Sequence, residues 1–372
     1  MKKIVCFVLM ITLSFCILSC QRKQIDVVRI GAILPLTGDG AGFGVPLKQG
    51  IDLAIEGINA AGGINGRRLE VIFEDSQGDA RTGLSAFNKL TIMDRVPLVL
   101  GSMTSIILAI QPEADRQGVV LINTSAVSPL INEASTDFLF NLVINGGTEA
   151  IAMARRFQNQ FPNESIAVIH ANNSSGIYVA NALTQALTRL GNTNFFTESH
   201  ETGTTDFRMH LERIRRNGAR FGYVHAQNLN EIADVLRQTR ELNIDMQWFS
   251  MSFAESREVI ELAGDAADGI IYSFPKISNE ELYSQFQEKF YSRNGVRADI
   301  LSANSYEALQ LIAAVMREYG TTALDIQKGL RTIDDFYGIF GHFKLSETGK
   351  QFVDRELLWK TIENGDFRIL EN

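Results

Sequence analysis

The chain has 372 residues, of which 45% are hydrophobic and 21% charged, and its formal net charge is −8. This acidic balance argues against a nucleic-acid partner, because phosphate recognition needs clustered Lys and Arg. The length is enough for two domains of ordinary size.

The N-terminus has the pattern of a secretion signal. Two lysines precede the apolar run Ile4 to Ser19, which as a helix would reach only about 24 Å, short of a ~30 Å hydrocarbon core. Ile17 to Cys20 looks like a bacterial lipobox. We therefore expect a signal peptide over 1–19 and a lipid anchor on Cys20, with a tether through 25. The alternative is ordinary cleavage near Ser19, which would leave a free thiol.

The first structured stretch predicts a strand, a loop, a helix and a second strand. The run 27–34 is apolar and rich in β-branched residues, as in a buried parallel strand. A helix face recurs at Leu47, Ile51, Ala54, Ile55 and Ile58, and the alternating run 69–75 predicts the next strand. Between them, 35–46 reads as a loop with four glycines around Phe43, where backbone N–H groups and one aromatic ring would face a ligand.

These glycines do not form a dinucleotide-binding motif. Phe43 and Val45 stand where GxGxxG requires its last glycine, and no acidic residue ends the second strand at the distance that suits a ribose. Nucleotide binding is therefore not expected.

Strands and helices continue to alternate along the rest of the chain. The expected strands are 97–101, 118–123, 166–171, 194–198, 221–226, 247–251, 268–273 and 356–362. The expected helices are 105–117, 148–161, 176–190, 206–216, 230–242, 278–291 and 302–319.

The segments PLTGDGAGFG, INAAGGINGRRLEV and FED, together with later matches in the same order, resemble the type I periplasmic solute-binding proteins of the branched-chain amino acid ABC transporter family. The resemblance implies an α/β fold with two Rossmann-like lobes joined by a three-strand hinge, the Venus flytrap arrangement. It places the N-terminal lobe at 26–142 and 275–341, and the C-terminal lobe at 143–274 and 342–372. Hinge closure around a ligand is the motion expected of such proteins.

The same resemblance implies ligand-binding residues in the first lobe. Thr104 and Ser105 lie in a Ser/Thr-rich loop that the family uses for a carboxylate, although either residue would also suit a helix cap. Ser125 and Val127 lie in the next such loop, where Ser125 is equally suited to an ordinary turn. Phe43 matches an aromatic wall of the pocket, or else a core contact within its own loop.

In the second lobe the resemblance points to Ser175, Asn228 and Ser252. At these positions, and at Val127, the chain departs from the branched-chain amino acid binders, which carry Thr at Val127, a Tyr at Ser175, often an aromatic near Asn228 and an acid at about Ser252. That acid pairs with the ligand's α-ammonium. Either Glu255 or another acid therefore substitutes for it, or the ligand lacks an α-amino group.

No catalytic motif, metal-binding spacing or P-loop is present, so neither an enzyme nor a cofactor is expected. The resemblance implies a monomeric substrate-binding lipoprotein in the periplasm or at the cell surface. It would capture a small polar or carboxylate-bearing solute and deliver it to an ABC permease in the inner membrane. The alternative is a sensor of the same fold that signals through a membrane receptor or regulator.

Overall fold

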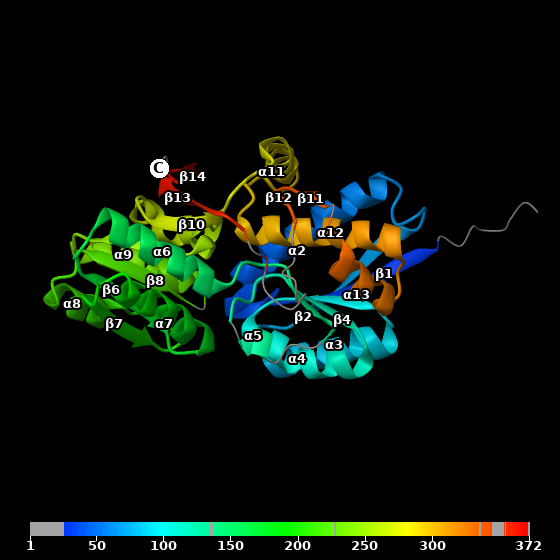
Figure 1. The fold of residues 1–372 in the computed structure, drawn as a ribbon, viewed down its shortest axis with the longest axis horizontal. Coiled ribbons are helices and arrows are strands. Elements are labelled where there is room, and N and C mark those ends of the chain that lie inside the picture. The colour runs from blue at the N-terminus through cyan, green and yellow to red at the C-terminus, as the bar shows by residue number, and fades with distance from the viewer. Residues whose placement is uncertain are drawn as a thin grey trace, which may run out of the picture.

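The computed structural model describes residues 26–128, 130–133, 137–226, 228–334, 336–343, 353 and 355–370. The predicted signal peptide and tether, with Cys20, lie outside these residues. Two α/β lobes sit side by side, each built on its own sheet (Figure 1). This confirms the fold class expected from the sequence.

The first lobe contains a five-stranded parallel sheet in the order β2-β1-β3-β4-β5. Its strands are β1 (Val27–Leu34), β2 (Arg68–Asp75), β3 (Leu98–Gly101), β4 (Val120–Asn123) and β5 (Leu139–Asn141). Its helices are α2 (Ala41–Ala60), α3 (Ala80–Asn88), α4 (Thr104–Gln117), α5 (Leu130–Glu133), α11 (Glu280–Asn294), α12 (Ile300–Tyr319) and α13 (Ala323–Thr332).

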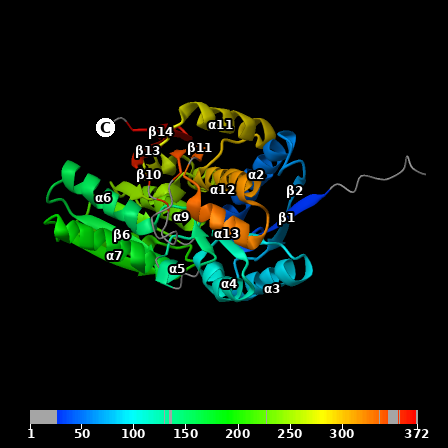
Figure 2. The same cartoon turned by 45° about the vertical axis from the view of Figure 1, so that its right-hand side comes forward.

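Alternation along β1 divides the core of this lobe between the two faces of the sheet. Ile30 and Leu34 pack in one cluster with Leu47 of α2, whereas Ile33 packs in another with Ile107 of α4. Helix α12 lies beside α2 in both views (Figures 1 and 2). The sheet is thus covered on both faces, as a buried parallel sheet requires.

The second lobe contains a seven-stranded sheet in the order β14-β13-β10-β9-β8-β6-β7. Its strands are β6 (Ile166–Ala171), β7 (Phe195–His200), β8 (Phe221–His225), β9 (Gln247–Ser250), β10 (Ile271–Pro275), β13 (Leu357–Glu363) and β14 (Asp366–Ile369). Its helices are α6 (Gly146–Gln160), α7 (Ser174–Arg189), α8 (Arg208–Arg216), α9 (Leu229–Glu241) and α10 (Arg257–Ala263). Strands β13 and β14 are antiparallel to their neighbours.

The chain passes between the lobes along three segments that touch one another. The Val353 N–H donates to the Val143 carbonyl, and the Lys276 N–H donates to the Glu356 carbonyl. Before the third passage, β11 (Tyr337–Gly338) and β12 (Gly341–His342) form a small hairpin. Within the described ranges, no helix is both long and apolar enough to cross a bilayer.

Several features differ from the elements expected from the sequence. Residues 35–46 are not all loop, because α2 begins at Ala41 and includes Pro46. Phe43 and Leu47 lie four residues apart on the buried face of this helix, so burial extends the helix toward its N-terminus. The helices α3, α10 and α13 and the strands β5 and β14 were not expected from the sequence.

Candidate functional site

Two adjoining cavities lie between the lobes, at the carboxyl ends of the strands of both sheets. The larger measures about 550 Å³ and is lined by Gly40, Gln77, Gly78, Met103, Thr104, Ser105 and Leu108 of the first lobe and by Asn173, Ser174, Ser175, Thr202 and Asn228 of the second. The smaller measures about 30 Å³ and is lined by Phe43, Met103, Thr104, Ser125, Ala126 and Val127 of the first lobe and by Ser175, His225, Ala226 and Phe253 of the second. Open α/β sheets bind ligands at this edge.

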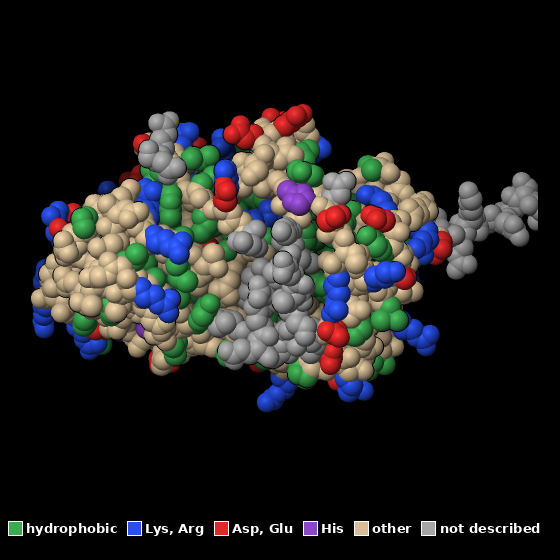
Figure 3. Space-filling model, in the orientation of Figure 1, with side chains coloured by type: hydrophobic (Ala, Val, Ile, Leu, Met, Phe, Trp, Pro, Cys, Tyr) green, Lys and Arg blue, Asp and Glu red, His purple; other side chains and the backbone are tan. Residues whose placement is uncertain are grey.

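A groove of about 660 Å³ on the second lobe is a less suitable candidate. Its walls come from α6 and from Arg355, Leu357 and Trp359, so it does not lie between the lobes. On the face shown in Figure 3, Lys and Arg side chains gather over α6. We therefore place the candidate site in the two cavities between the lobes.

The first-lobe side of the site is built on the N-terminus of α4. Met103 precedes the helix with φ of 64°, and its side chain does not cap it. The prediction that Thr104 or Ser105 caps α4 is therefore wrong, because both residues lie inside the helix. Their hydroxyls line the larger cavity, next to backbone N–H groups that have no intrahelical partner.

The loop after β4 is held by Asn123. Its Oδ1 accepts the N–H groups of Ser125 (3.2 Å) and Ala126 (2.8 Å). The N–H of Ser125 is thus already bonded within its own loop. Ser125 still faces the smaller cavity, where its Oγ accepts the Met103 N–H at 3.4 Å. Val127 adds an apolar wall there.

The second-lobe side of the site contains a buried serine and histidine. Ser175, in the first turn of α7, shares a hydrogen bond of 3.2 Å between its Oγ and Nε2 of His225, the last residue of β8. Burial, with smaller contributions from His170 and His200, lowers the pKa of His225 to about 3. The imidazole is therefore neutral at physiological pH. Asn228 lines the larger cavity and forms a capping box with Glu231 at the start of α9.

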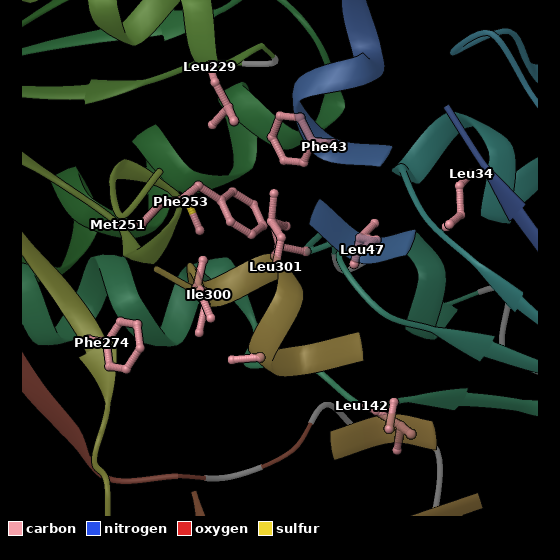
Figure 4. Close-up of a cluster of buried hydrophobic side chains, with 14 of the residues drawn as sticks. Leu34, Phe43, Leu47, Leu142, Leu229, Met251, Phe253, Phe274, Ile300 and Leu301 are labelled. Atoms are coloured by element: carbon pink, nitrogen blue, oxygen red, sulfur yellow. The ribbon is translucent and has the colours of Figure 1, made fainter. Parts of the chain in front are cut away.

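An aromatic contact joins the two lobes beside the smaller cavity. The rings of Phe43, on α2, and Phe253, in the loop after β9, meet edge to face with centroids 5.3 Å apart (Figure 4). Such pairs contribute about 0.5–1.5 kcal/mol beyond the area that they bury. The ring of Phe43 therefore contacts the opposite lobe as well as its own core.

Ser252 lies away from the other predicted residues and lines neither cavity. Its N–H and Oγ donate to the carboxylate of Glu149 at 2.8 and 3.0 Å, and Ser273 Oγ donates to the same carboxylate at 2.6 Å. Burial raises the pKa of Glu149 to about 7, although these three hydrogen bonds act in the opposite direction. Glu255, the acid that the sequence suggested as a substitute, is paired with Lys360 and Tyr272.

Comparison with known proteins places this architecture in a family. The family model described as periplasmic binding protein matches residues 27–360. The chain belongs to the periplasmic binding protein family. Among its relatives, the Leu/Ile/Val-binding protein homolog 3 of Brucella melitensis is 25% identical over 328 residues, which cover 87% of this chain and 88% of the relative.

Solved structures share the fold of this periplasmic binding protein. A leucine binding protein, LivK, from Thermotoga maritima has a TM-score of 0.84 at 21% identity and covers 92% of this chain and 98% of its own. A solute-binding protein of an ABC transporter from R. palustris was solved in complex with benzoate. It has a TM-score of 0.83 at 15% identity, and the match covers 92% of this chain and 95% of that one.

In this periplasmic binding protein, seven of the predicted ligand-binding residues come together around the two cavities: Phe43, Thr104, Ser105, Ser125, Val127, Ser175 and Asn228. Sequence reasoning missed His225 and Phe253. His225 ends the buried strand β8, and Phe253 lies three residues after the end of β9, so their places near strand ends were the available signal. Within the described ranges, no group of three or more His, Cys, Asp or Glu lies close enough to hold a metal ion.

Proposed function

We propose that this periplasmic binding protein is the substrate-binding lipoprotein of a bacterial ABC importer. It captures a small polar or carboxylate-bearing solute, such as an amino acid or a related compound, and delivers it to a permease in the inner membrane. It makes and breaks no covalent bond, acts as a monomer, and is anchored through Cys20. The lobe boundaries at 142, 275 and 341 are part of this proposal.

The observation that carries the proposal is that both lobes line the same cavities. Thr104 comes from the first lobe and Ser175 from the second, and both lie on each of the two cavities. A solute that contacts both residues binds the closed arrangement more tightly than the open one, so it shifts the population toward closure. The named relatives support small carboxylates as solutes, since one is named for Leu, Ile and Val and another was solved with benzoate.

A thermal-shift screen of the chain from Gln24 onward tests this function. The panel contains amino acids, carboxylates without an amino group, amides and aromatic acids. A solute present at 100 times its dissociation constant stabilises the folded protein by about 2.7 kcal/mol, which gives a clear rise in melting temperature. Ser175→Ala is expected to reduce the rise, because it removes a cavity hydroxyl.

Ser85→Ala is the matched control. Ser85 is exposed on α3, outside both cavities, so the same substitution there leaves the rise unchanged. If no solute shifts the melting temperature, or if both variants respond alike, the cavities between the lobes are not the binding site. A solute that binds while no permease associates would favour the sensor alternative.

A further inference from the structure

The charge of the cleft restricts the class of solute. This inference rests on the proposed function: we infer that the solute carries an anionic head and an apolar body, and no cationic amino group. Among the described residues that line the two cavities, none is Asp, Glu, Lys or Arg. An ammonium group buried there would lose its water and gain no counter-charge from these walls.

The most deeply hydrogen-bonded of the buried acids near Ser252 is Glu149. Glu149 is 2% exposed and accepts three hydrogen bonds, two from Ser252 and one from Ser273. All three donors belong to the second lobe. Neither Glu149 nor Ser252 lines either cavity. A solute that stays within the two cavities therefore does not contact this carboxylate.

Three further acids of the second lobe contact or neighbour residues of the site. Glu231 accepts the N–H groups of Gly203 and Asn228 within its own lobe. Glu255 is buried in an ion pair with Lys360. Glu258 lies against Gly42 in the first turn of α2, where a Cβ atom on Gly42 would come within 1.7 Å of its Oε2. None of the three lines the cavities.

The groups that do line the cavities suit an anion with an apolar body. Hydroxyl donors come from both lobes, Thr104 and Ser105 at the start of α4 and Ser175 at the start of α7. Both helix starts favour negative charge. Phe43 and Phe253 supply an apolar wall beside these donors. His225 is neutral, so it adds a hydrogen-bonding group without a charge.

Isothermal titration with matched pairs of compounds tests this inference on the whole soluble chain. Leucine is compared with 4-methylpentanoate, and phenylalanine with 3-phenylpropanoate, so each pair differs only in the ammonium group. We expect the member without the ammonium to bind at least about tenfold more tightly, because a buried charge without a partner costs more than 1.4 kcal/mol. Equal or tighter binding of the amino acid overturns the inference.

If the amino acids bind as tightly or more tightly, two acid variants identify which carboxylate pairs with the ammonium group. Glu149→Gln and Glu258→Gln are expected to leave the preference within each pair unchanged, because neither carboxylate faces the cavities. A loss of amino acid affinity in either variant shows that this acid does pair with an ammonium group, and it also overturns the inference.

If no member of either pair binds, a second experiment tests the inference. The protein is then dialysed against a metabolite extract, and the retained compound is identified by mass spectrometry. A retained cationic amine overturns this inference but leaves the proposed function standing, whereas a retained anion without an amino group supports both. If no compound is retained, the proposed function fails together with the inference.

Discussion

At the scale of single residues, the most informative group is Glu149, a carboxylate held by two serines from different strands and loops. Burial raises its pKa from an ordinary value of 4.5 to about 7. The folded protein therefore retains a proton on Glu149 over a pH range in which the unfolded chain has already released it. It follows that the contribution of Glu149 to stability is fully present below about pH 4.5 and is lost as pH rises toward 7.

Glu149→Gln is expected to remove this pH dependence. The free energy of unfolding of the natural chain should fall relative to that of the variant by up to about 3 kcal/mol between pH 4.5 and pH 8. Urea unfolding at both pH values measures the difference. Glu318→Gln is the control. Glu318 is exposed on α12, so this substitution should leave the pH dependence of the free energy of unfolding unchanged. Parallel curves for all three proteins would contradict the assignment.

At the scale of elements, each lobe brings a helix close to the end of its first strand by means of a glycine. A Cβ atom on Gly44 of α2 would lie 2.0 Å from the Pro35 carbonyl oxygen, and one on Gly176 of α7 would lie 2.1 Å from the Ala171 carbonyl oxygen. Each glycine directly follows a cavity residue, Phe43 or Ser175. The close approach of helix to strand therefore positions the site on both sides of the cleft.

Gly176→Ala is expected to displace α7 from β6. The clash involves backbone on both sides, so it cannot be relieved by a side-chain rotation, and we expect a loss of stability of about 1–3 kcal/mol together with weaker solute binding. Chemical unfolding and titration measure the two effects. Gly57→Ala is the matched control within α2. Its Cβ would meet only Gln310 Nε2, at 3.8 Å, so it should be neutral or slightly stabilising.

At the scale of the whole molecule, a buried ion pair joins the first lobe to the third passage of the chain. Arg355 Nη2 donates to Glu307 Oε2 of α12 at 2.6 Å, with side-chain exposures of 10% and 6%. The Phe340 N–H donates to the other carboxylate oxygen of Glu307 at 3.3 Å. Burial raises the pKa of Glu307, with Arg355 acting in the opposite direction. The pair thus links helix packing in one lobe to the hinge.

Arg355→Met is expected to destabilise the protein by about 3–5 kcal/mol at neutral pH, because it leaves Glu307 buried without its cation. The loss should shrink in acid, where Glu307 takes up a proton. Adding Glu307→Gln should restore much of the stability, since no buried charge then remains. Unfolding of the single and double variants at pH 5 and pH 8 measures this, and a double variant no more stable than Arg355→Met would contradict the role of the pair.

The sequence by itself determined the class of fold, most strands and long helices, and the strand-to-helix connections near which Phe43, Thr104, Ser105, Ser125 and Ser175 lie, although all of these residues except Ser125 fall within helices. Hydrophobic periodicity reports which face of an element is buried, and parallel strands place their following loops at one edge. The helices α3, α10 and α13 were not recognised from the sequence.

Only the tertiary structure decided which polar groups meet. Glu149 and Ser252 are 103 residues apart, and Ser175 and His225 are 50 apart, so no local pattern relates them. Their contacts depend on strand order, on helix placement and on how the two lobes pack. The pKa of a group depends in turn on its burial and its partners. Which acids are free to meet a solute was therefore decided by packing between distant segments.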